Sequence, residues 1–285
     1  MTNLAVLALL STVVMVLEQV FHIRLGQGGL GGLLVMAAVF GFGGAFISLL
    51  LSKWIAKRTM GVVVIVQPRT DSEQWLIGTV TRLAAQANIG MPEVGVFDAP
   101  EMNAFATGYR RDAALVAVSS GLLRGMSRNQ VEAVLGHEIT HVANGDMVTL
   151  TLIQGVVNTF VIFLSRIIGS LVDRTVFKND RSGPGIGYFV VTMVAQIVLG
   201  IFASMIVAAF SRYREFRADR GGANLAGTGN MISALQALQH SQGAPMPPQM
   251  QAFGINTGTS PGIMRLFMSH PPLEQRIAAL NAPAR

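Results

Sequence analysis

The residues best suited to chemistry are two histidines and a glutamate in the run His137-Glu138-Ile139-Thr140-His141. If this run is helical, His137 and His141 lie on one face of the helix, about one turn apart. Two imidazoles at this spacing can share a metal ion, and Glu138 beside them can take a proton from water that the metal activates. The motif therefore predicts a hydrolytic metal site. Two partly buried helix histidines without a metal are the plainer alternative.

The neighbouring sequence predicts the helix that this motif requires. Ser127 and Gln130 have the spacing of a capping box, in which each side chain caps a backbone N–H of the other residue. Gly145, directly after Asn144, is a typical helix stop. Hydrophobic residues recur at helical spacing between these signals, namely Val131, Val134, Leu135, Ile139 and Val142. We therefore expect both histidines on one helix.

A catalytic zinc site usually has three protein ligands and a water molecule, so a third ligand is needed. The chain has no cysteine, which leaves histidine and carboxylate side chains as the possible ligands. Glu215 is the strongest candidate. Asp219, one helical turn further on, can accept the second N–H of a ligand histidine and set its orientation. A solvated run of helical ion pairs is the alternative for this segment.

The composition indicates an integral membrane protein. Hydrophobic residues make up 51% of the chain and charged residues only 13%, against roughly 25% charged residues in soluble domains. The net charge of +6 does not indicate nucleic-acid binding, because many basic residues lie at the ends of apolar stretches and no basic-aromatic pattern is present. A formal GxGxxG match at 26–31 follows an apolar stretch rather than a strand, so a dinucleotide site is excluded.

Four apolar stretches are long enough to cross a bilayer core of about 30 Å. A cleaved signal peptide is the rival interpretation of the first stretch, but no basic residue precedes its apolar run. Basic residues follow the second and fourth stretches, which places those ends, and the N-terminus, in the cytoplasm. The predicted spans are 4–21, 32–52, 147–172 and 186–210.

The segments between and after these spans resemble soluble, folded sequence. We expect strands at Val62–Val66, Val94–Phe97 and Ala113–Val118, and a helix capped by Asp71 or Ser72. Residues 103–108 could form a sheet edge that binds a substrate as an added strand. An ordinary turn with a buried Phe105 is the alternative. Residues 241–262 are predicted to form a long mobile loop, and a last helix is predicted after Pro272.

At this point the chain resembles a known family over essentially its whole length: the HtpX membrane zinc metalloproteases, which are related to the CAAX prenyl proteases. The resemblance implies an α+β fold, with a mainly helical gluzincin-like metalloprotease domain, a small β-sheet and four transmembrane helices. It implies one zinc ion per subunit, bound by His137, His141 and Glu215, with Glu138 as the general base. The segments that carry it are Asn103–Gly108, Leu135–His141, Ser211–Asp219 and Ser269–Pro272.

The resemblance also implies where the protein works and on what. It predicts a multi-pass protein of the bacterial inner membrane, with both termini and the catalytic domain in the cytoplasm. Its substrates would be misfolded or damaged membrane proteins, and it would lie in the lipid bilayer. Nucleic acid would not be a partner. The resemblance does not specify the oligomeric state. The implied organisation is two N-terminal membrane helices (1–52), the first catalytic part with the metal motif (53–146), a membrane hairpin (147–209) and the second catalytic part with the third ligand (210–285).

The sequence offers candidate residues for two further roles, a donor for the oxyanion and a binding site for the substrate strand. A donor for the tetrahedral oxyanion is needed, and His270, Arg276 and Tyr213 are candidates; a capping or packing role is the alternative for His270. A substrate strand would bind at Asn103, Ala104 and Phe105.

Three other functions compete with the protease. One is a catalytically silent scaffold that keeps the peptidase fold. A second is a transporter or metal channel, which would concentrate ionisable groups inside the spans, where only Glu18 and Arg166 are found. A third is a zinc hydrolase that acts on a bond other than a peptide bond.

Overall fold

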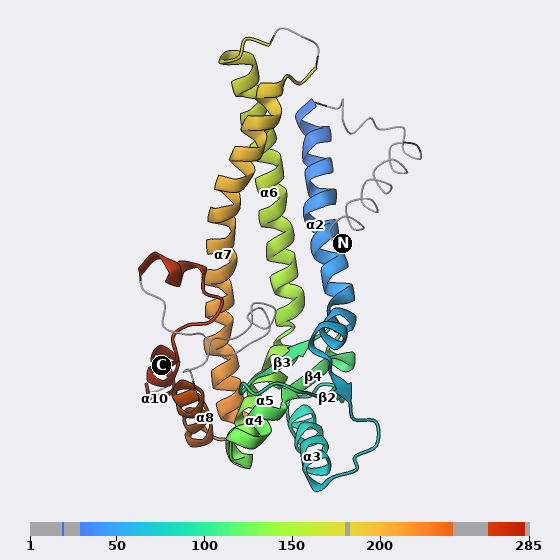
Figure 1. The fold of residues 1–285 in the computed structure, drawn as a ribbon, viewed down its shortest axis with the longest axis vertical. Coiled ribbons are helices and arrows are strands. Elements are labelled where there is room, and N and C mark those ends of the chain that lie inside the picture. The colour runs from blue at the N-terminus through green and yellow to red at the C-terminus, as the bar shows by residue number, and fades with distance from the viewer. Residues whose placement is uncertain (1–18, 20–28, 180–182, 242–261, 283–285) are drawn as a thin grey trace. The chain divides into compact units, whose positions relative to one another are not determined.

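The structure is a computed structural model that describes residues 19, 29–179, 183–241 and 262–282 (Figure 1). The predicted first span, 4–21, lies outside the described residues apart from Gln19, and so does nearly all of the predicted loop 241–262. Contacts divide the chain into two compact units. One consists of residues 1–48 and 150–207, and the other of residues 49–149 and 208–285.

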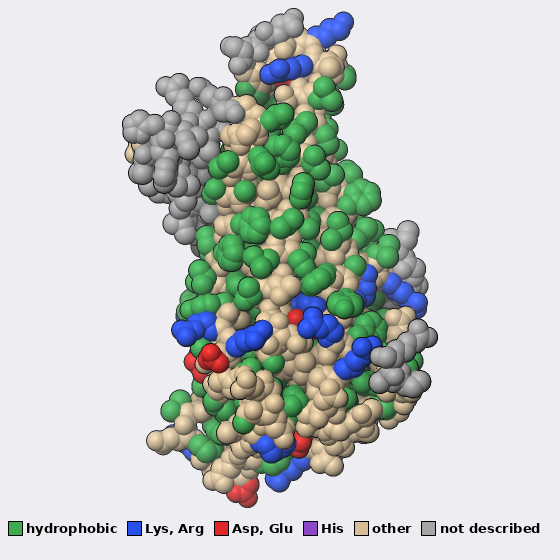
Figure 2. All heavy atoms as spheres, turned by 180° about the vertical axis from the view of Figure 1, so that it is seen from behind, with side chains coloured by type: hydrophobic (Ala, Val, Ile, Leu, Met, Phe, Trp, Pro, Cys, Tyr) green, Lys and Arg blue, Asp and Glu red, His purple; other side chains and the backbone are tan. Residues whose placement is uncertain are grey.

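Three helices in the described part of the chain are long and apolar enough to cross a membrane, where the sequence predicts four spans. They match the second, third and fourth predicted spans. Little of their apolar surface is buried inside the protein, between 17% and 22% of the most apolar window, and Figure 2 shows hydrophobic side chains gathered along the long helices. The helices are α2 (Gly29–Met60), α6 (Asp146–Thr175) and α7 (Ile186–Ala226).

Glycines let these helices approach one another closely. A Cβ atom added to Gly41 of α2 would lie 2.6 Å from the backbone nitrogen of Thr159 in α6. At the far end of α6, the buried carboxylate of Asp173 accepts hydrogen bonds from the backbone N–H groups of Gly185, at 2.9 Å, and Tyr188, at 3.1 Å. A small residue therefore lets α2 and α6 pack closely, and a satisfied carboxylate links the two ends of the hairpin of α6 and α7.

The second unit contains a four-stranded mixed sheet with the order β1-β2-β4-β3. Strands β2 and β4 are parallel, and the other two pairs are antiparallel. The strands are β1 (Val63–Val64), β2 (Glu93–Phe97), β3 (Ala104–Thr107) and β4 (Leu115–Ser119). The strand predicted at Val62–Val66 is thus only two residues long. The strand predicted from Ala113 begins later because a 3-10 turn, η1 (Arg111–Ala113), precedes it.

Among the described residues of this unit, three helices pack against the sheet, namely α3 (Asp71–Gln86), α4 (Ser120–Gly125) and α5 (Arg128–Asn144). Helix α8 (Thr228–Ser241) packs on α5, and α10 (Leu273–Asn281) packs on α8. A 3-10 helix, η2 (Gly262–Phe267), precedes α10. Fully buried Leu76 of α3, Leu135 of α5 and Leu235 of α8 belong to one hydrophobic cluster. The core therefore holds α5, the helix of the metal motif, on several sides.

The helix ends follow the capping signals in the sequence, with one correction. Ser127 and Gln130 form the predicted capping box of α5, and Gly145 ends this helix in the left-handed conformation with φ of 67°. The predicted cap of α3, Asp71 or Ser72, is wrong. Thr70 is the N-cap because its hydroxyl accepts a hydrogen bond from the backbone N–H of Glu73. The side chain of Glu73 in turn accepts one from the backbone N–H of Thr70.

Candidate metal centre

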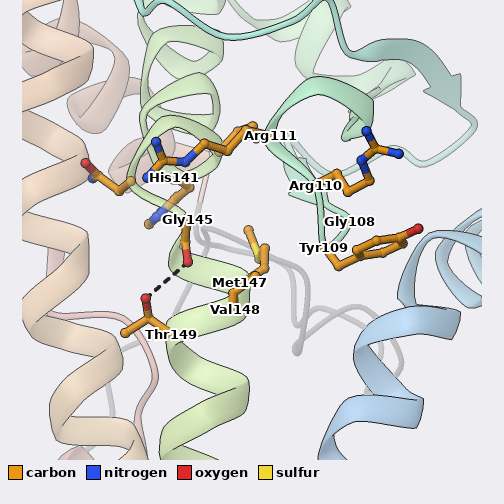
Figure 3. A pocket seen from close by; sticks show the side chains of 11 residues that line it. Gly108, Tyr109, Arg110, Arg111, His141, Gly145, Met147, Val148 and Thr149 are labelled. Atoms are coloured by element: carbon orange, nitrogen blue, oxygen red, sulfur yellow. Dashed lines mark hydrogen bonds between the residues drawn. The ribbon is translucent and has the colours of Figure 1, made fainter.

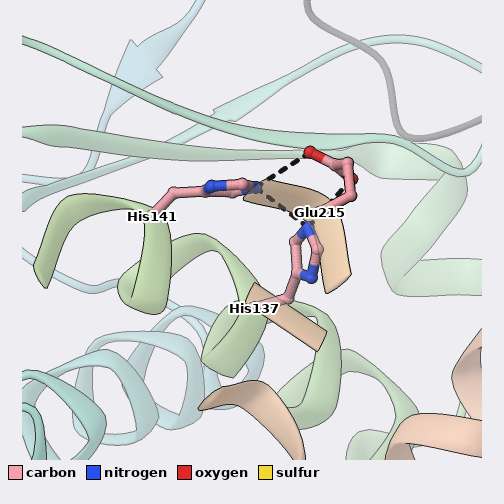
Figure 4. Close-up of side chains that lie close together, drawn as sticks. All are labelled: His137, His141 and Glu215. Carbon is pink, nitrogen blue, oxygen red and sulfur yellow. Dashed lines mark hydrogen bonds and ion pairs between the residues drawn. The ribbon is translucent and has the colours of Figure 1, made fainter. Parts of the chain in front are cut away.

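Two helices bring the three predicted ligands together within one compact unit. His137 and His141 project from α5, and Glu215 projects from the part of α7 that lies beyond the predicted membrane span. The two helices touch where α7 carries glycine: a Cβ added to Gly222 would lie 2.9 Å from the backbone nitrogen of His137. Only a residue without a side chain permits this approach, and the approach places Glu215 over the histidines (Figure 4).

The ligand atoms are spaced as a small tetrahedral ion requires. The Nε2 atoms of His137 and His141 are 3.1 Å apart. Glu215 Oε1 lies 3.2 Å from Nε2 of His141, and Glu215 Oε2 lies 3.5 Å from Nε2 of His137. Tetrahedral zinc with ligand bonds of 2.0–2.1 Å places neighbouring ligand atoms about 3.3 Å apart. All three side chains are buried.

Carboxylates behind both histidines set the direction in which the rings present their nitrogens. Nδ1 of His141 lies 2.7 Å from Asp146, and Nδ1 of His137 lies 3.0 Å from Asp219. When Nδ1–H donates to a carboxylate, the Nε2 atom carries a lone pair. When both rings are neutral in this tautomer, the two Nε2 lone pairs, 3.1 Å apart, face one place where a cation can bind. The histidine and carboxylate groups therefore fit a divalent metal such as zinc.

Asp146 is a site residue that the sequence analysis missed. It is the first residue of α6 and follows the helix-ending Gly145. Because Gly145 adopts the left-handed conformation, the chain turns sharply there, and the carboxylate of Asp146 comes back to the ring of His141. An acidic residue directly after a glycine helix stop, five positions beyond a candidate ligand, was the signal in the sequence.

Arg276 of α10 holds Asp219 in place. Its guanidinium donates to both carboxylate oxygens of Asp219, at 2.8 and 2.5 Å. Burial raises the pKa of Asp219, but the charge and hydrogen bonds of Arg276 outweigh this effect and lower the pKa to about 2. Arg276 is only 1% exposed. It was a candidate oxyanion donor, and the structure instead commits most of its hydrogen bonds to the carboxylate behind His137.

His270 lies against the ligand carboxylate. Its Nδ1 is 2.8 Å from Oε2 of Glu215, yet the two atoms are not aligned for a hydrogen bond, and within the described chain neither has a hydrogen-bond partner. Oε2 of Glu215 is thus a buried carboxylate oxygen without an aligned hydrogen bond, although Nδ1 of His270 and Nη1 of Arg276 lie within 3.5 Å of it. Such an oxygen can still accept a cation as a partner. The third oxyanion candidate, Tyr213, is 61% exposed and packs against Phe210 instead.

Glu138 lies next to His137 on α5 and is 4% exposed. Burial raises the pKa of Glu138 above its ordinary value of 4.5, although the neighbouring histidines act in the opposite direction. A carboxylate with a raised pKa is a better proton acceptor near neutral pH than an ordinary one. The position and the environment of Glu138 both suit a general base.

Of the candidate substrate-binding residues, Ala104 and Phe105 begin the edge strand β3 and Asn103 directly precedes it, and all three side chains are buried. Phe105 packs on Phe97, with ring centroids 5.6 Å apart. The alternative interpretation of this segment expected the burial of Phe105, but the segment is a strand and not a turn. Asn103 is fully buried, and its side-chain amide has no hydrogen-bond partner among the described residues. Any pairing of β3 with another strand would therefore use its backbone N–H and C=O groups and not these side chains.

A cavity of about 310 Å³ adjoins the metal site within the same unit (Figure 3). His141 contributes to its wall, and so do Tyr109, Arg110 and Arg111, which follow β3. The sequence analysis did not single out these residues. Two adjacent arginines shortly after the candidate substrate edge were the available signal.

Comparison with known proteins agrees with the fold and shows the family. The model of Peptidase family M48 matches residues 70–284, and the chain belongs to this family. Protease HtpX of Alkalilimnicola ehrlichii is 59% identical over an alignment of 287 positions, which covers 99% of this chain and 95% of that protein. Protease HtpX of Pseudomonas aeruginosa is 59% identical over an alignment of 286 positions, which covers 100% of this chain and 97% of that protein. The resemblance inferred from the motifs is thereby confirmed.

A solved structure has the same fold at low sequence identity. The crystal structure of S. mikatae Ste24p matches with a TM-score of 0.61 and 20% identity. The match covers 87% of this chain but only 58% of Ste24p. Together with the three apolar helices, these similarities indicate a multi-pass membrane protein.

Proposed function

We propose that this protein is a membrane-embedded zinc endopeptidase. The observation that carries the proposal is the convergence of His137, His141 and Glu215, with a carboxylate behind each histidine and Glu138 beside them. Membership of peptidase family M48 and full-length similarity to proteins named protease HtpX support it. A silent scaffold is less well supported, because a fold without catalysis does not need the complete set of residues.

In the proposed reaction, a bound zinc ion would polarise the scissile carbonyl and lower the pKa of water. Glu138 takes the proton of the attacking water and passes it to the leaving amine. Asp146 and Asp219 hold the two imidazoles with Nε2 toward the ion. His270, next to Glu215, is the remaining side chain that we propose as a donor for the oxyanion.

We propose that the substrate chain pairs with β3. Strand β3 lies at one end of the sheet order and pairs only with β4 in the described structure. The backbone of Asn103 bonds to Ser119 on the β4 side. Because backbone direction alternates along an antiparallel strand, the N–H and C=O groups of Ala104 and Ala106 point away from β4. An extended peptide can bond to these groups regardless of its sequence.

The setting that we propose is the bacterial inner membrane, with the catalytic unit and both termini in the cytoplasm and misfolded or damaged membrane proteins as substrates. The membrane segments would be 1–52 and 147–209, and the catalytic segments 53–146 and 210–285. A backbone-based edge site supports a broad substrate range, because an unfolded segment offers the same main-chain groups whatever its side chains.

The test is cleavage of an unfolded protein by detergent-purified material, for wild type and Glu138→Gln, with zinc counted in both. The amide is the same size as the carboxylate but cannot accept the proton, so zinc content should stay equal while turnover falls by at least about 10²-fold. Zinc in both proteins with cleavage in neither would favour the silent scaffold. A folded wild type that binds no zinc would refute the proposal.

A further inference from the structure

We infer that the cavity beside His141 is a subsite that binds a carboxylate of the peptide substrate, so that the protein prefers an acidic group near the bond it cuts. This inference rests on the proposed peptidase function and goes beyond it, because it names the substrate chemistry. The carboxylate can come from an aspartate or glutamate side chain or from the carboxyl terminus of the peptide.

The size and position of the cavity suit a side chain of the substrate. Its volume of about 310 Å³ is at the lower end of the range typical of small-molecule sites. Its wall includes His141, a candidate metal ligand, so a group bound there is next to the reacting centre. The segment from Gly108 to Arg111, which begins directly after β3, also lines the cavity. A peptide paired with β3 and cut at the metal would therefore pass the cavity.

The charge of the cavity wall is positive. Arg110 and Arg111 are exposed, line the cavity, and make no ion pair in the part of the chain that the structure describes. No aspartate or glutamate is among the lining residues. The nearest acidic residue in sequence, Asp112, accepts a hydrogen bond from the backbone N–H of Gly90, at 2.8 Å. Two guanidinium groups are thus available to an incoming anion.

The two arginine side chains lie on different sides of the cavity, so both can contact one bound ligand. Arg111 extends toward His141 and Gly145, whereas Arg110 and Tyr109 lie together on the other side of the cavity (Figure 3). Arginine binds carboxylates through paired, charge-assisted hydrogen bonds, and a tyrosine hydroxyl can add another. Met147 and Val148 supply apolar surface for the methylene groups that carry a side-chain carboxylate.

A purely structural role for Arg111 explains less. The negative end of the α5 dipole lies near it, because a Cβ added to Gly145 would be 3.6 Å from its Nη2 atom. The carbonyl groups of His141 and Val142, however, are already bonded to the N–H of Gly145. Attraction to a helix end is worth only about 0.3–1 kcal/mol at an exposed position, and it gives no reason for Arg110.

The inference can be tested by binding, without turnover. Zinc-loaded Glu138→Gln protein in a neutral detergent is titrated against fluorescent peptides of one unstructured sequence, in which a single glutamate is moved along the chain and compared with glutamine at the same place. A second series has free or amidated carboxyl termini. We expect at least one glutamate position, or the free terminus, to bind about tenfold more tightly than its neutral counterpart.

Arginine variants in the same background decide whether the cavity causes the preference. Arg110→Gln and Arg111→Gln should each reduce it severalfold, and Arg111→Glu should replace it by a preference for lysine. Arg69→Gln is the matched control, because Arg69 is exposed and does not line the cavity. The glutamate and terminal series show which source of carboxylate is used.

Three results would overturn the inference. They are equal binding of all charged and neutral peptides, a preference that survives in both arginine variants, and arginine-dependent binding to vesicles with anionic lipid in the absence of any peptide preference. The last would assign the arginines to lipid headgroups. Failure of the proposed function would be recognised separately, by the absence of cleavage or zinc in the wild type, since the binding experiment does not depend on catalysis.

Discussion

Each candidate ligand histidine has a buried carboxylate behind it, and one of these carboxylates is paired in turn with a buried arginine. Asp146 supports His141, while Asp219 supports His137 and is in turn held by Arg276. A buried charge without a partner is unfavourable. Removal of one of these charged side chains would therefore leave its partner buried and unpaired. The supporting residues should therefore matter nearly as much for zinc affinity as the ligands themselves.

Asp146→Asn tests this at the residue that sequence reasoning missed. The amide keeps the size of the side chain but no longer fixes Nδ1–H of His141 by a charged acceptor. We expect zinc affinity to fall about 10- to 100-fold, measured by competition with a chelating dye. Asp71→Asn, on an exposed residue in the first turn of α3, should leave the affinity unchanged. Unaltered affinity in Asp146→Asn would exclude the supporting role.

Zinc loading should release protons. Burial lowers the pKa of His141, but its hydrogen bonds to Asp146 and Glu215 outweigh this effect and raise the pKa to about 10 in the metal-free protein. Below pH 10 the ring therefore carries a proton that must leave before Nε2 can bind zinc. Zinc affinity should rise as pH increases toward about 10.

The measurement is calorimetry of zinc binding at pH 7.5 in buffers with different ionisation enthalpies. The number of protons released follows from the dependence of the heat on the buffer. Asp146→Asn should release fewer protons than wild type, because the raised pKa of His141 depends on that carboxylate. A heat that does not depend on the buffer would contradict the prediction.

At the scale of elements, the crossing of α5 and α7 determines the site. Gly222 of α7 lies against the backbone of His137, and Gly221 lies against Thr140. Because α7 continues without a break from the membrane span to Glu215, its path past α5 decides where the third ligand lies. The lengths of the helices follow from hydrophobic pattern, but their crossing depends on two glycines.

Gly222→Ala should disturb this crossing. The added Cβ would lie 2.9 Å from the backbone nitrogen of His137, so the helices must separate, at a cost of about 1–3 kcal/mol. We expect a lower thermal midpoint in detergent and weaker zinc binding. Gly229→Ala in α8 is the control, since nothing lies within 4 Å of its added Cβ. Equal behaviour of the two variants would show that the crossing tolerates a side chain.

At the scale of the whole molecule, each compact unit is assembled from separate stretches of sequence. The unit with the metal site combines residues 49–149 with 208–285. His137 comes from the first stretch, and Glu215, Asp219 and Arg276 come from the second. A fragment that ends before α7 would therefore contain the HExxH motif but not the third ligand or the support of His137.

The basic residues after the second predicted span have a role inside the folded unit as well. Lys53 and Lys57, which the sequence analysis used to place this end of the helix in the cytoplasm, both form ion pairs with Glu93 of β2. Lys53 also donates to the carbonyl of Ala113, at 2.8 Å. Their positions at the end of α2 thus serve the packing of the sheet, in addition to any effect on topology.

The sequence by itself determined the features that depend on local pattern. The lengths of the hydrophobic stretches predicted the three long apolar helices that the structure describes. Capping residues predicted both ends of α5, and the four-residue spacing predicted that His137 and His141 share a face of it. These properties follow from interactions among residues close in the chain, which periodicity records directly. The cap of α3 was missed by one residue because neighbouring threonine, aspartate and serine all make good caps.

Only the tertiary structure decided how distant segments meet. Sequence spacing does not predict that Arg276 holds Asp219 or that Asp146 turns back to His141. It also does not predict that two arginines line a cavity beside this histidine. These contacts depend on the path of the chain through glycine turns and on the packing of helices far apart in sequence. Local pattern carries little information about such contacts, because their geometry is determined by the packed core as a whole.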